Sequence, residues 1–281
     1  MTTRTMMCMG ALACAALVAA VSATAAPFLA EDSFDGYAAG SAVNGQGGWS
    51  QSNSGTTYRV VGGGGAGGTN GVSIPDGSHQ LNWTGNAFDW GTLAVGDKVI
   101  ARMDFQANGS GQFDDDRVGW VLASNPDSSS YHFGVQLDNT DNGAPGGLVT
   151  YFRDNVGTRV LSATPIPWAS LGASGSNWYR EELTVTKLTS ALGPGGAQVD
   201  VSFLALDGSG NPIGAPLAAS YGTLDTSAVR GFSGTVYPMF KNYSSTAGNA
   251  DNAYFEVTPE PATMGLLSVG LLALLRRRRR R

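Results

Sequence analysis

The sequence predicts an all-β body, a two-sheet antiparallel β-sandwich, placed between a signal peptide and a short C-terminal membrane helix. Composition is the first observation: only 14% of residues are charged and 40 are glycine, which favours turns and short strands over surface helices. Periodicity is the second, because apolar and polar residues alternate with period two in several segments. Third, no segment of the body has the period of an amphipathic helix of ordinary length.

The first 25 residues have the organisation of a secretory signal peptide. Arg4 precedes an apolar stretch at 9–21, and small residues at Ala23 and Ala25 form a site for signal peptidase. We expect the exported chain to begin at Ala26. Both cysteines of the chain lie in this leader, so a buried apolar core rather than disulfides must stabilise the body.

The body, residues 26–257, is expected to form one β-sandwich domain. Its alternating segments predict strands at 98–107, 118–123, 131–138, 148–153, 178–187, 199–207 and 253–257. Turn-forming sequences such as Asp141-Asn142-Gly143 separate these segments. Since most of the strands are half apolar, they are predicted to be antiparallel, with hairpin and Greek-key links between two sheets.

Residues 258–281 contain three parts in a fixed order. Pro259, Glu260 and Pro261 precede an uncharged stretch at 262–275, which as a helix spans ~21 Å of a ~30 Å hydrocarbon core. Six arginines follow as a stop-transfer signal, and they are expected to remain cytoplasmic while the body faces the periplasm. These are Arg276, Arg277, Arg278, Arg279, Arg280 and Arg281. The residues alone leave a permanent anchor and a processed tail equally open.

This arrangement resembles the PEP-CTERM sorting signal of Gram-negative bacteria. The resemblance implies export across the inner membrane, transient residence in that membrane, and recognition and cleavage by an exosortase near Pro259-Glu260-Pro261. It further implies delivery to the cell surface or to an extracellular polysaccharide matrix. A sorting signal is an address, so it does not define the activity of the body.

The body resembles concanavalin A-like (laminin G-like) modules in several short segments. The similarity lies in Asp32-Ser33-Phe34-Asp35-Gly36-Tyr37, in Trp178-Tyr179-Arg180 and in the closing residues 251–257. The resemblance implies a jelly-roll sandwich in which the first and last strands lie close together. Phe34 is then expected near Phe255.

Charge excludes one class of function. Without the leader and the terminal arginines, the chain carries 10 basic and 22 acidic residues, a net charge of −12. An acidic domain without a basic stripe is repelled by phosphate backbones, so the sequence predicts no nucleic-acid partner.

Two groups of residues are candidates for ligand binding. Asp114, Asp115 and Asp116 concentrate carboxylates in a predicted turn and could hold Ca²⁺, the one cofactor considered, although a solvated acidic turn is the alternative. Trp83 and Trp90 lie in a loop-rich region and could stack on sugar rings if exposed, although burial in the core is the alternative.

No catalytic pattern in the sequence is complete, so no catalytic residue is predicted. Glu181 and Glu182 are adjacent, and on a strand they point to opposite faces, which rules out a paired acid and base. The glycine-dense segment 62–68 lacks the residues that bind nucleotide phosphate and predicts a flexible loop. We therefore expect a non-catalytic protein that binds carbohydrate or contributes structure to a matrix. A secreted glycan-active hydrolase or lyase with a divergent site is the alternative.

Overall fold

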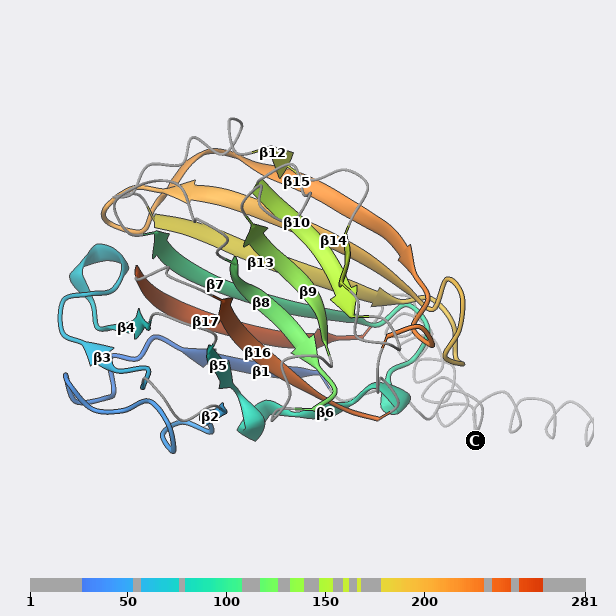
Figure 1. Ribbon diagram of the computed structural model, residues 1–281, viewed down its shortest axis with the longest axis horizontal. Helices are drawn as coiled ribbons and strands as arrows, with labels where there is room; N and C mark the ends of the chain where they lie inside the picture. The colour runs from blue at the N-terminus through green and yellow to red at the C-terminus, as the bar shows by residue number, and fades with distance from the viewer. Residues whose placement is uncertain are drawn as a thin grey trace, which may run out of the picture.

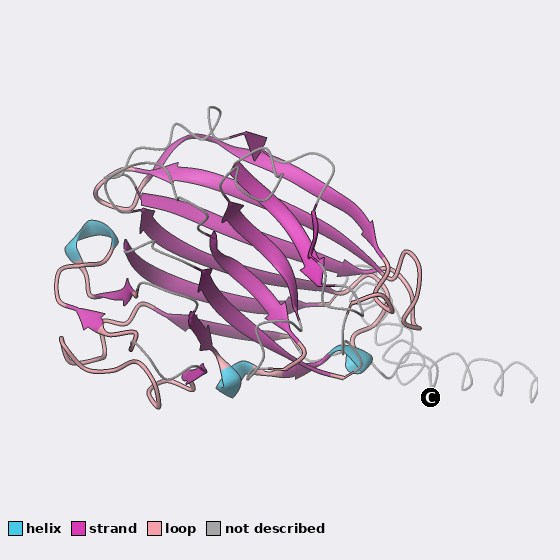
Figure 2. Cartoon of the chain, in the orientation of Figure 1, coloured by secondary structure: helices cyan, strands magenta, loops and turns pink. Residues whose placement is uncertain are grey.

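The computed structural model of the chain describes residues 27–52, 57–75, 79–107, 117–125, 132–138, 147–153, 159–161, 166–167, 178–229, 234–243 and 248–259. In these ranges the chain forms β-strands and three one-turn 3₁₀ helices (Figure 2). The strands are β1 (Phe28–Asp32), β2 (Ser50–Ser52), β3 (Val60–Val61), β4 (Gly71–Ile74), β5 (His79–Asn82), β6 (Phe88–Asp89), β7 (Lys98–Ala107), β8 (Arg117–Ala123), β9 (His132–Asp138), β10 (Gly147–Arg153), β11 (Arg159–Leu161), β12 (Ile166–Pro167), β13 (Trp178–Lys187), β14 (Ala197–Leu206), β15 (Pro212–Leu224), β16 (Thr235–Tyr243) and β17 (Gly248–Thr258). The 3₁₀ helices are η1 (Ala66–Gly68), η2 (Thr84–Asn86) and η3 (Trp90–Thr92).

The first sheet has eight strands. Its order is β15, β14, β13, β7, β17, β4 and β3, and β1 pairs with β17 next to the β4 contact. The last strand, β17, therefore lies inside the sheet, with β7 on one side and both β1 and β4 on the other. All of these pairings are antiparallel.

The second sheet has nine strands. Its order is β11, β10, β9, β8, β16, β5 and β2, with β12 beside β10 and β6 beside β16. In Figure 1 the strands β8, β9, β10 and β16 lie as a separate layer in front of β7, β13, β14 and β17. The structure therefore confirms the predicted two-sheet antiparallel sandwich.

Four of the long strands follow the predicted alternation of apolar and polar side chains. Strands β7 and β13 begin and end at the predicted residues, β14 contains all but the last residue of the predicted segment 199–207, and β17 contains the predicted segment 253–257. In β7 the side chains of Val99, Ala101, Met103 and Phe105 are all buried in the core. Their neighbours point to the opposite face, which we call the outer face of the sheet.

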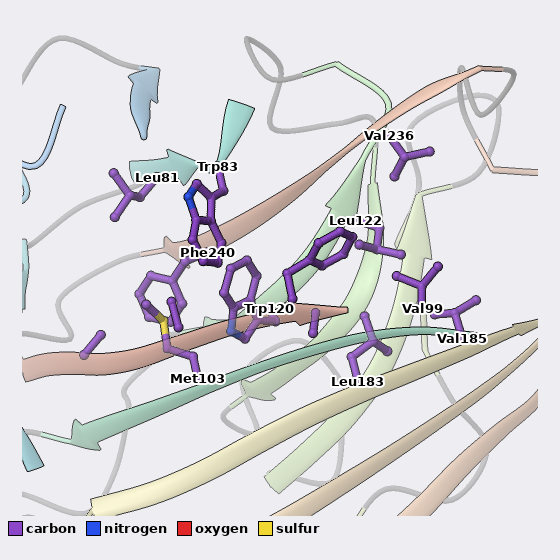
Figure 3. Packing of buried hydrophobic residues seen from close by; sticks show 14 of the residues in the cluster. Leu81, Trp83, Val99, Met103, Trp120, Leu122, Leu183, Val185, Val236 and Phe240 are labelled. Carbon is purple, nitrogen blue, oxygen red and sulfur yellow. The ribbon is translucent and has the colours of Figure 1, made fainter. Parts of the chain in front are cut away.

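Large aromatic side chains fill the space between the sheets. The rings of Trp49 and Trp83 are stacked, with centroids 4.5 Å apart and an interplanar angle of 6°. Figure 3 shows Trp83, Trp120 and Phe240 packed over Met103 of the first sheet. Aromatic residues bury about 150–250 Å² each, so this cluster supplies much of the apolar area that stabilises a body expected to lack disulfides.

The first and last described strands lie side by side, as the concanavalin A-like resemblance implies. Strand β1 pairs with β17 from Phe28 opposite Val257 to Asp32 opposite Ala253. The rings of Phe28 and Phe255 make an edge contact with centroids 6.1 Å apart. Phe34 follows the end of β1 and packs instead against Tyr37 and Trp49.

The glycine-dense segment 62–68 folds over the outer face of the first sheet. Its Ala66 N–H donates to the Asp251 carboxylate at 2.9 Å, and its Gly67 N–H donates to the Gly208 carbonyl at 3.2 Å. A Cβ atom at Gly65 would lie 2.6 Å from the Asp251 carboxylate, so the close approach requires glycine. The segment predicted as a loop thus makes defined contacts with β17 and with the turn at Gly208.

Candidate binding site

A pocket of about 290 Å³ opens on the outer face of the first sheet. Four strands supply its walls: β1, β7, β13 and β17. Its lining includes the side chains of Glu31, Ser33, Arg102, Arg180, Asn252 and Tyr254. These four strands are hydrogen-bonded in one sheet, and Ser33 directly follows β1, so the pocket is built mainly from sheet residues.

A β-bulge in β17 shapes the pocket. The pairing of β17 with β7 shifts register between Asp251 and Tyr254. On its other edge, β17 pairs with β4 up to Ala250 and with β1 from Ala253 onward. The bulge therefore lies where β17 changes its partner strand. Asn252 adopts a left-handed conformation with φ of 50°, which asparagine tolerates better than most residues.

Arg180 and Asp104 form an ion pair beneath the pocket. The Arg180 Nε and Nη2 donate to the two oxygens of Asp104 at 2.7 and 2.8 Å, and the Asn252 side-chain amide donates to the same carboxylate at 3.0 Å. Asp104 has no exposed surface. The hydrogen bonds to Asp104 raise the pKa of Arg180, so this guanidinium stays charged throughout the accessible pH range.

Arg102 forms a second cationic wall with fewer restraints. Its guanidinium lies 4.1 Å from the centre of the Tyr254 ring, and its nearest carboxylate is Glu182 at 3.8 Å. Tyr254 donates its hydroxyl proton to Glu256, and burial together with this bond raises the pKa of Tyr254 to about 12. Arg102 therefore retains N–H donors for a ligand, whereas the face of the Tyr254 ring is already covered.

A second buried carboxylate lies next to the ion pair. Asp251 pairs with Asp104 across β7 and β17, and it accepts hydrogen bonds from the Ala66 N–H and the Thr69 hydroxyl, both at 2.9 Å. Desolvation raises the pKa of Asp251 to about 6. The glycine-dense segment thus seals this carboxylate away from the pocket.

The pocket can offer both donors and acceptors to one small ligand. Arg102 supplies donors, while Glu31 and Ser33 supply exposed acceptors at the end of β1. Asp32 has a structural role, because it accepts hydrogen bonds from the Trp49 indole and the Phe34 N–H, both at 2.8 Å. A mixed set of this kind fits a neutral ligand that carries many hydroxyl groups better than it fits an anion.

Two of the predicted binding residues lie elsewhere, in the core. Trp83 and Trp90 are only 2% and 4% exposed. Trp83 stacks on Trp49, and its indole N–H donates to the Gly47 carbonyl at 2.9 Å. The hypothesis that these two rings stack on sugars was wrong, because both rings are buried. A large aromatic ring can pack on a sugar, but it can equally fill the core between two sheets.

The structure confirms the opposite orientation of Glu181 and Glu182. Glu181 points into the core, is 1% exposed, and accepts a hydrogen bond from the Trp120 N–H at 3.2 Å. Burial raises the pKa of Glu181 well above its usual range. Glu182 lies on the outer face near Arg102. The two carboxylates therefore do not form a catalytic pair.

The remaining predicted site residues lie beyond the described part of the chain. These are Ala23, Ala25, Asp114, Asp115, Asp116, Glu260, Pro261 and the six arginines Arg276–Arg281. Pro259 is described and directly follows β17. Within the described ranges there is no cluster of metal-binding side chains. In the same ranges no helix is long and apolar enough to cross a membrane.

The polar faces of two strands contained a signal for the pocket. Arg102 and Asp104 in β7, and Arg180 and Glu182 in β13, occupy the solvent-facing positions of the predicted alternation. Their juxtaposition depends on the register that places Arg180 opposite Asp104. Nothing in one sequence gives that register, and the contribution of Asn252 depends in addition on the bulge.

The comparisons with known proteins agree with both parts of this description. Residues 257–280 match the PEP-CTERM protein-sorting motif. Metal-free lectin I-B4 from Griffonia simplicifolia aligns with a TM-score of 0.50 and 12% identity, over 83% of this chain and 100% of the lectin. Lectin II from Ulex europaeus aligns with a TM-score of 0.48 and 10% identity, over 84% and 99%. A carbohydrate esterase of bacteriophage phi24B aligns with a TM-score of 0.38 and 16% identity, over 75% of this chain and 90% of the esterase. No curated protein matches the sequence of this chain.

Proposed function

Starting from a legume lectin-like, concanavalin A-like sandwich that ends in a PEP-CTERM sorting motif, we propose an exported cell-surface protein that binds carbohydrate. The motif indicates export and sorting to the cell envelope. The fold by itself defines no activity, so the proposal for binding rests on the pocket.

The proposed route has three steps. Signal peptidase cuts after Ala25, the stretch 262–275 halts in the inner membrane of a Gram-negative cell, and the arginines at 276–281 remain cytoplasmic. An exosortase then cleaves near Pro259-Glu260-Pro261 and releases the body to the surface or to an extracellular polysaccharide matrix. The position of the PEP-CTERM match at 257–280, which begins at the last two residues of β17, supports this order.

The single observation that supports carbohydrate binding is the mixed polarity of the pocket. Arg102 can donate to sugar oxygens, and Glu31 and Ser33 can accept from sugar hydroxyl groups. A volume of about 290 Å³ is at the lower limit of typical small-molecule sites, which fits one or two sugar rings rather than a long chain. Because Arg180 is neutralised by Asp104, the pocket does not select strongly for anions.

The binding proposal is tested with purified exported protein on a glycan array, followed by calorimetric titration of each glycan retained. We expect Arg102→Ala to weaken binding about tenfold or more, since hydrogen bonds to charged groups contribute about 1.5–3 kcal/mol. Lys98→Ala is the matched control, because Lys98 is an exposed cation on the same face of β7 and does not line the pocket. Failure to retain any glycan, or equal weakening by both variants, would refute binding at this pocket.

A further inference from the structure

Large apolar side chains are exposed at six positions among the described residues, and five of them lie at one end of the sandwich. Phe28, Leu29, Val95, Leu188 and Leu192 form this group, which we call the apolar end. Single exposed apolar residues are ordinary on soluble proteins, whereas a group of them marks a surface that contacts something else.

Strand register places these residues together. Phe28 and Leu29 begin β1 opposite Val257 and Glu256 near the end of β17. Thr258 of β17 and Thr186 of β13 both pair with Lys98 at the start of β7. Val95 therefore lies just before β7 and Leu188 just after β13, at the same edge of the sheet. Figure 1 shows the start of β7 and the β13–β14 connection at the same end of the view.

The two loops of the apolar end are fixed by hydrogen bonds. The buried Lys187 ammonium donates to the Trp90 and Leu93 carbonyls at 3.0 and 2.7 Å. The Gly96 N–H donates to the Lys187 carbonyl at 2.7 Å, which holds the Val95 loop against β13. Leu188 N–H donates to Gly196 at 2.9 Å and closes the loop that carries Leu192. The apolar side chains are therefore presented by ordered backbone.

The sorting motif leaves the sandwich at this same end. Thr258 is the last residue of β17, and only residues 259–261 separate it from the uncharged stretch 262–275. Three residues reach at most about 10 Å when fully extended. The headgroup layer on one side of a bilayer is roughly 5–7 Å thick. A bilayer that holds 262–275 is consequently within reach of the apolar end.

We propose that the apolar end docks on the lipid surface of the membrane that holds the sorting motif. This inference rests on the membrane insertion of 262–275 in the proposed function. Among the described residues near this end, Lys98 and Asp89 are exposed and carry opposite charges, and Glu256 opposite Leu29 is half-buried. The apolar side chains enter the interfacial layer, as the apolar faces of peripheral proteins do.

The test uses the exported chain, purified in detergent after leader removal and reconstituted into vesicles of neutral phosphatidylcholine. Cleavage after Ala25 removes both native cysteines, so single cysteines can carry an environment-sensitive fluorophore. The test positions are Val95→Cys and Leu192→Cys, and Ile213→Cys is the matched control. Ile213 is 52% exposed against 48% for Val95 but lies at the start of β15, at the opposite end.

We expect nitroxide-labelled lipids to quench the fluorophore at positions 95 and 192 and to leave it unchanged at 213. Flotation with the vesicles reports insertion of 262–275 separately. Vesicles that float with the protein but show no quenching at 95 and 192 would overturn the inference and leave the membrane-held tail intact. If the protein does not float with the vesicles, both the docking of the apolar end and the membrane insertion of 262–275 are overturned. A response seen only in membranes from the producing cells, and not in pure lipid, would assign the apolar end to a protein partner and also overturn the proposal.

Discussion

Replacing Arg180 by alanine would leave the Asp104 carboxylate without its cationic partner in a position that has no exposed surface. The carboxylate loses two charge-assisted hydrogen bonds, at 2.7 and 2.8 Å, and keeps the one from Asn252. Breaking a buried ion pair costs about 3–5 kcal/mol. Because the Arg180 side chain is itself 28% exposed, we expect the lower end, about 3 kcal/mol.

Urea unfolding followed by tryptophan fluorescence measures this cost, since the chain has six tryptophans, several of them in the core. Arg180→Lys is expected to recover part of the loss by restoring a charge without the bidentate geometry. Arg180→Ala combined with Asp104→Asn is expected to cost less than the sum of the single changes, because no buried charge is then left unpaired. A loss below about 0.5 kcal/mol for Arg180→Ala, or strict additivity in the double variant, would refute this account of the pair.

Three further predictions concern stability and sorting. The raised pKa of Asp251, about 6 against 3.8, means that its folded form binds a proton more tightly than the unfolded chain does. The Asp251 side chain therefore contributes fully to stability below pH 3.8, and this contribution, up to about 3 kcal/mol, is lost as pH rises through about 6. The difference in urea midpoint between wild type and Asp251→Asn should change with pH over the same range. Trp49→Ala should cost about 3–5 kcal/mol in the same unfolding assay, while Ile213→Ala, exposed on β15, should be near neutral; equal effects would contradict the core described above. Replacing Pro259, Glu260 and Pro261 by alanine should leave the uncut chain in the membrane fraction on immunoblots of fractionated cells, and normal release would count against exosortase processing.

Alternation of apolar and polar residues located seven of the described strands, β7, β8, β9, β10, β13, β14 and β17. Strands β7 and β13 were predicted to the residue because each has one apolar and one polar face over ten residues. Strand β15 was not predicted, since it is an edge strand with mostly exposed side chains and is interrupted by Gly214 and Gly222. Strand β16 was not predicted either, because Pro238 breaks its pattern.

The pocket could not be predicted because its geometry comes from distant parts of the chain. Arg180 and Asp104 are 76 positions apart, and only the register of β7 and β13 brings them together. The two tryptophans were misassigned for a related reason. Trp83 follows β5 in a turn-rich sequence, yet its ring enters the core and stacks on Trp49 from a separate segment. A local sequence describes the backbone at such a position but not the space that its side chain fills.

The central position of β17 has a consequence for the order in which this domain can fold. On the proposed export route the N-terminus emerges first, so β1, β3 and β4 cross the inner membrane before residues 248–258. Until then the first sheet consists of separate pieces, β15 to β7 on one side and β4 with β3 on the other, because β17 joins them. The sandwich therefore closes only after the whole body has passed through the translocation channel. On the proposed export route, the strand that joins the two parts of the first sheet is thus the last part of the sandwich to cross the membrane.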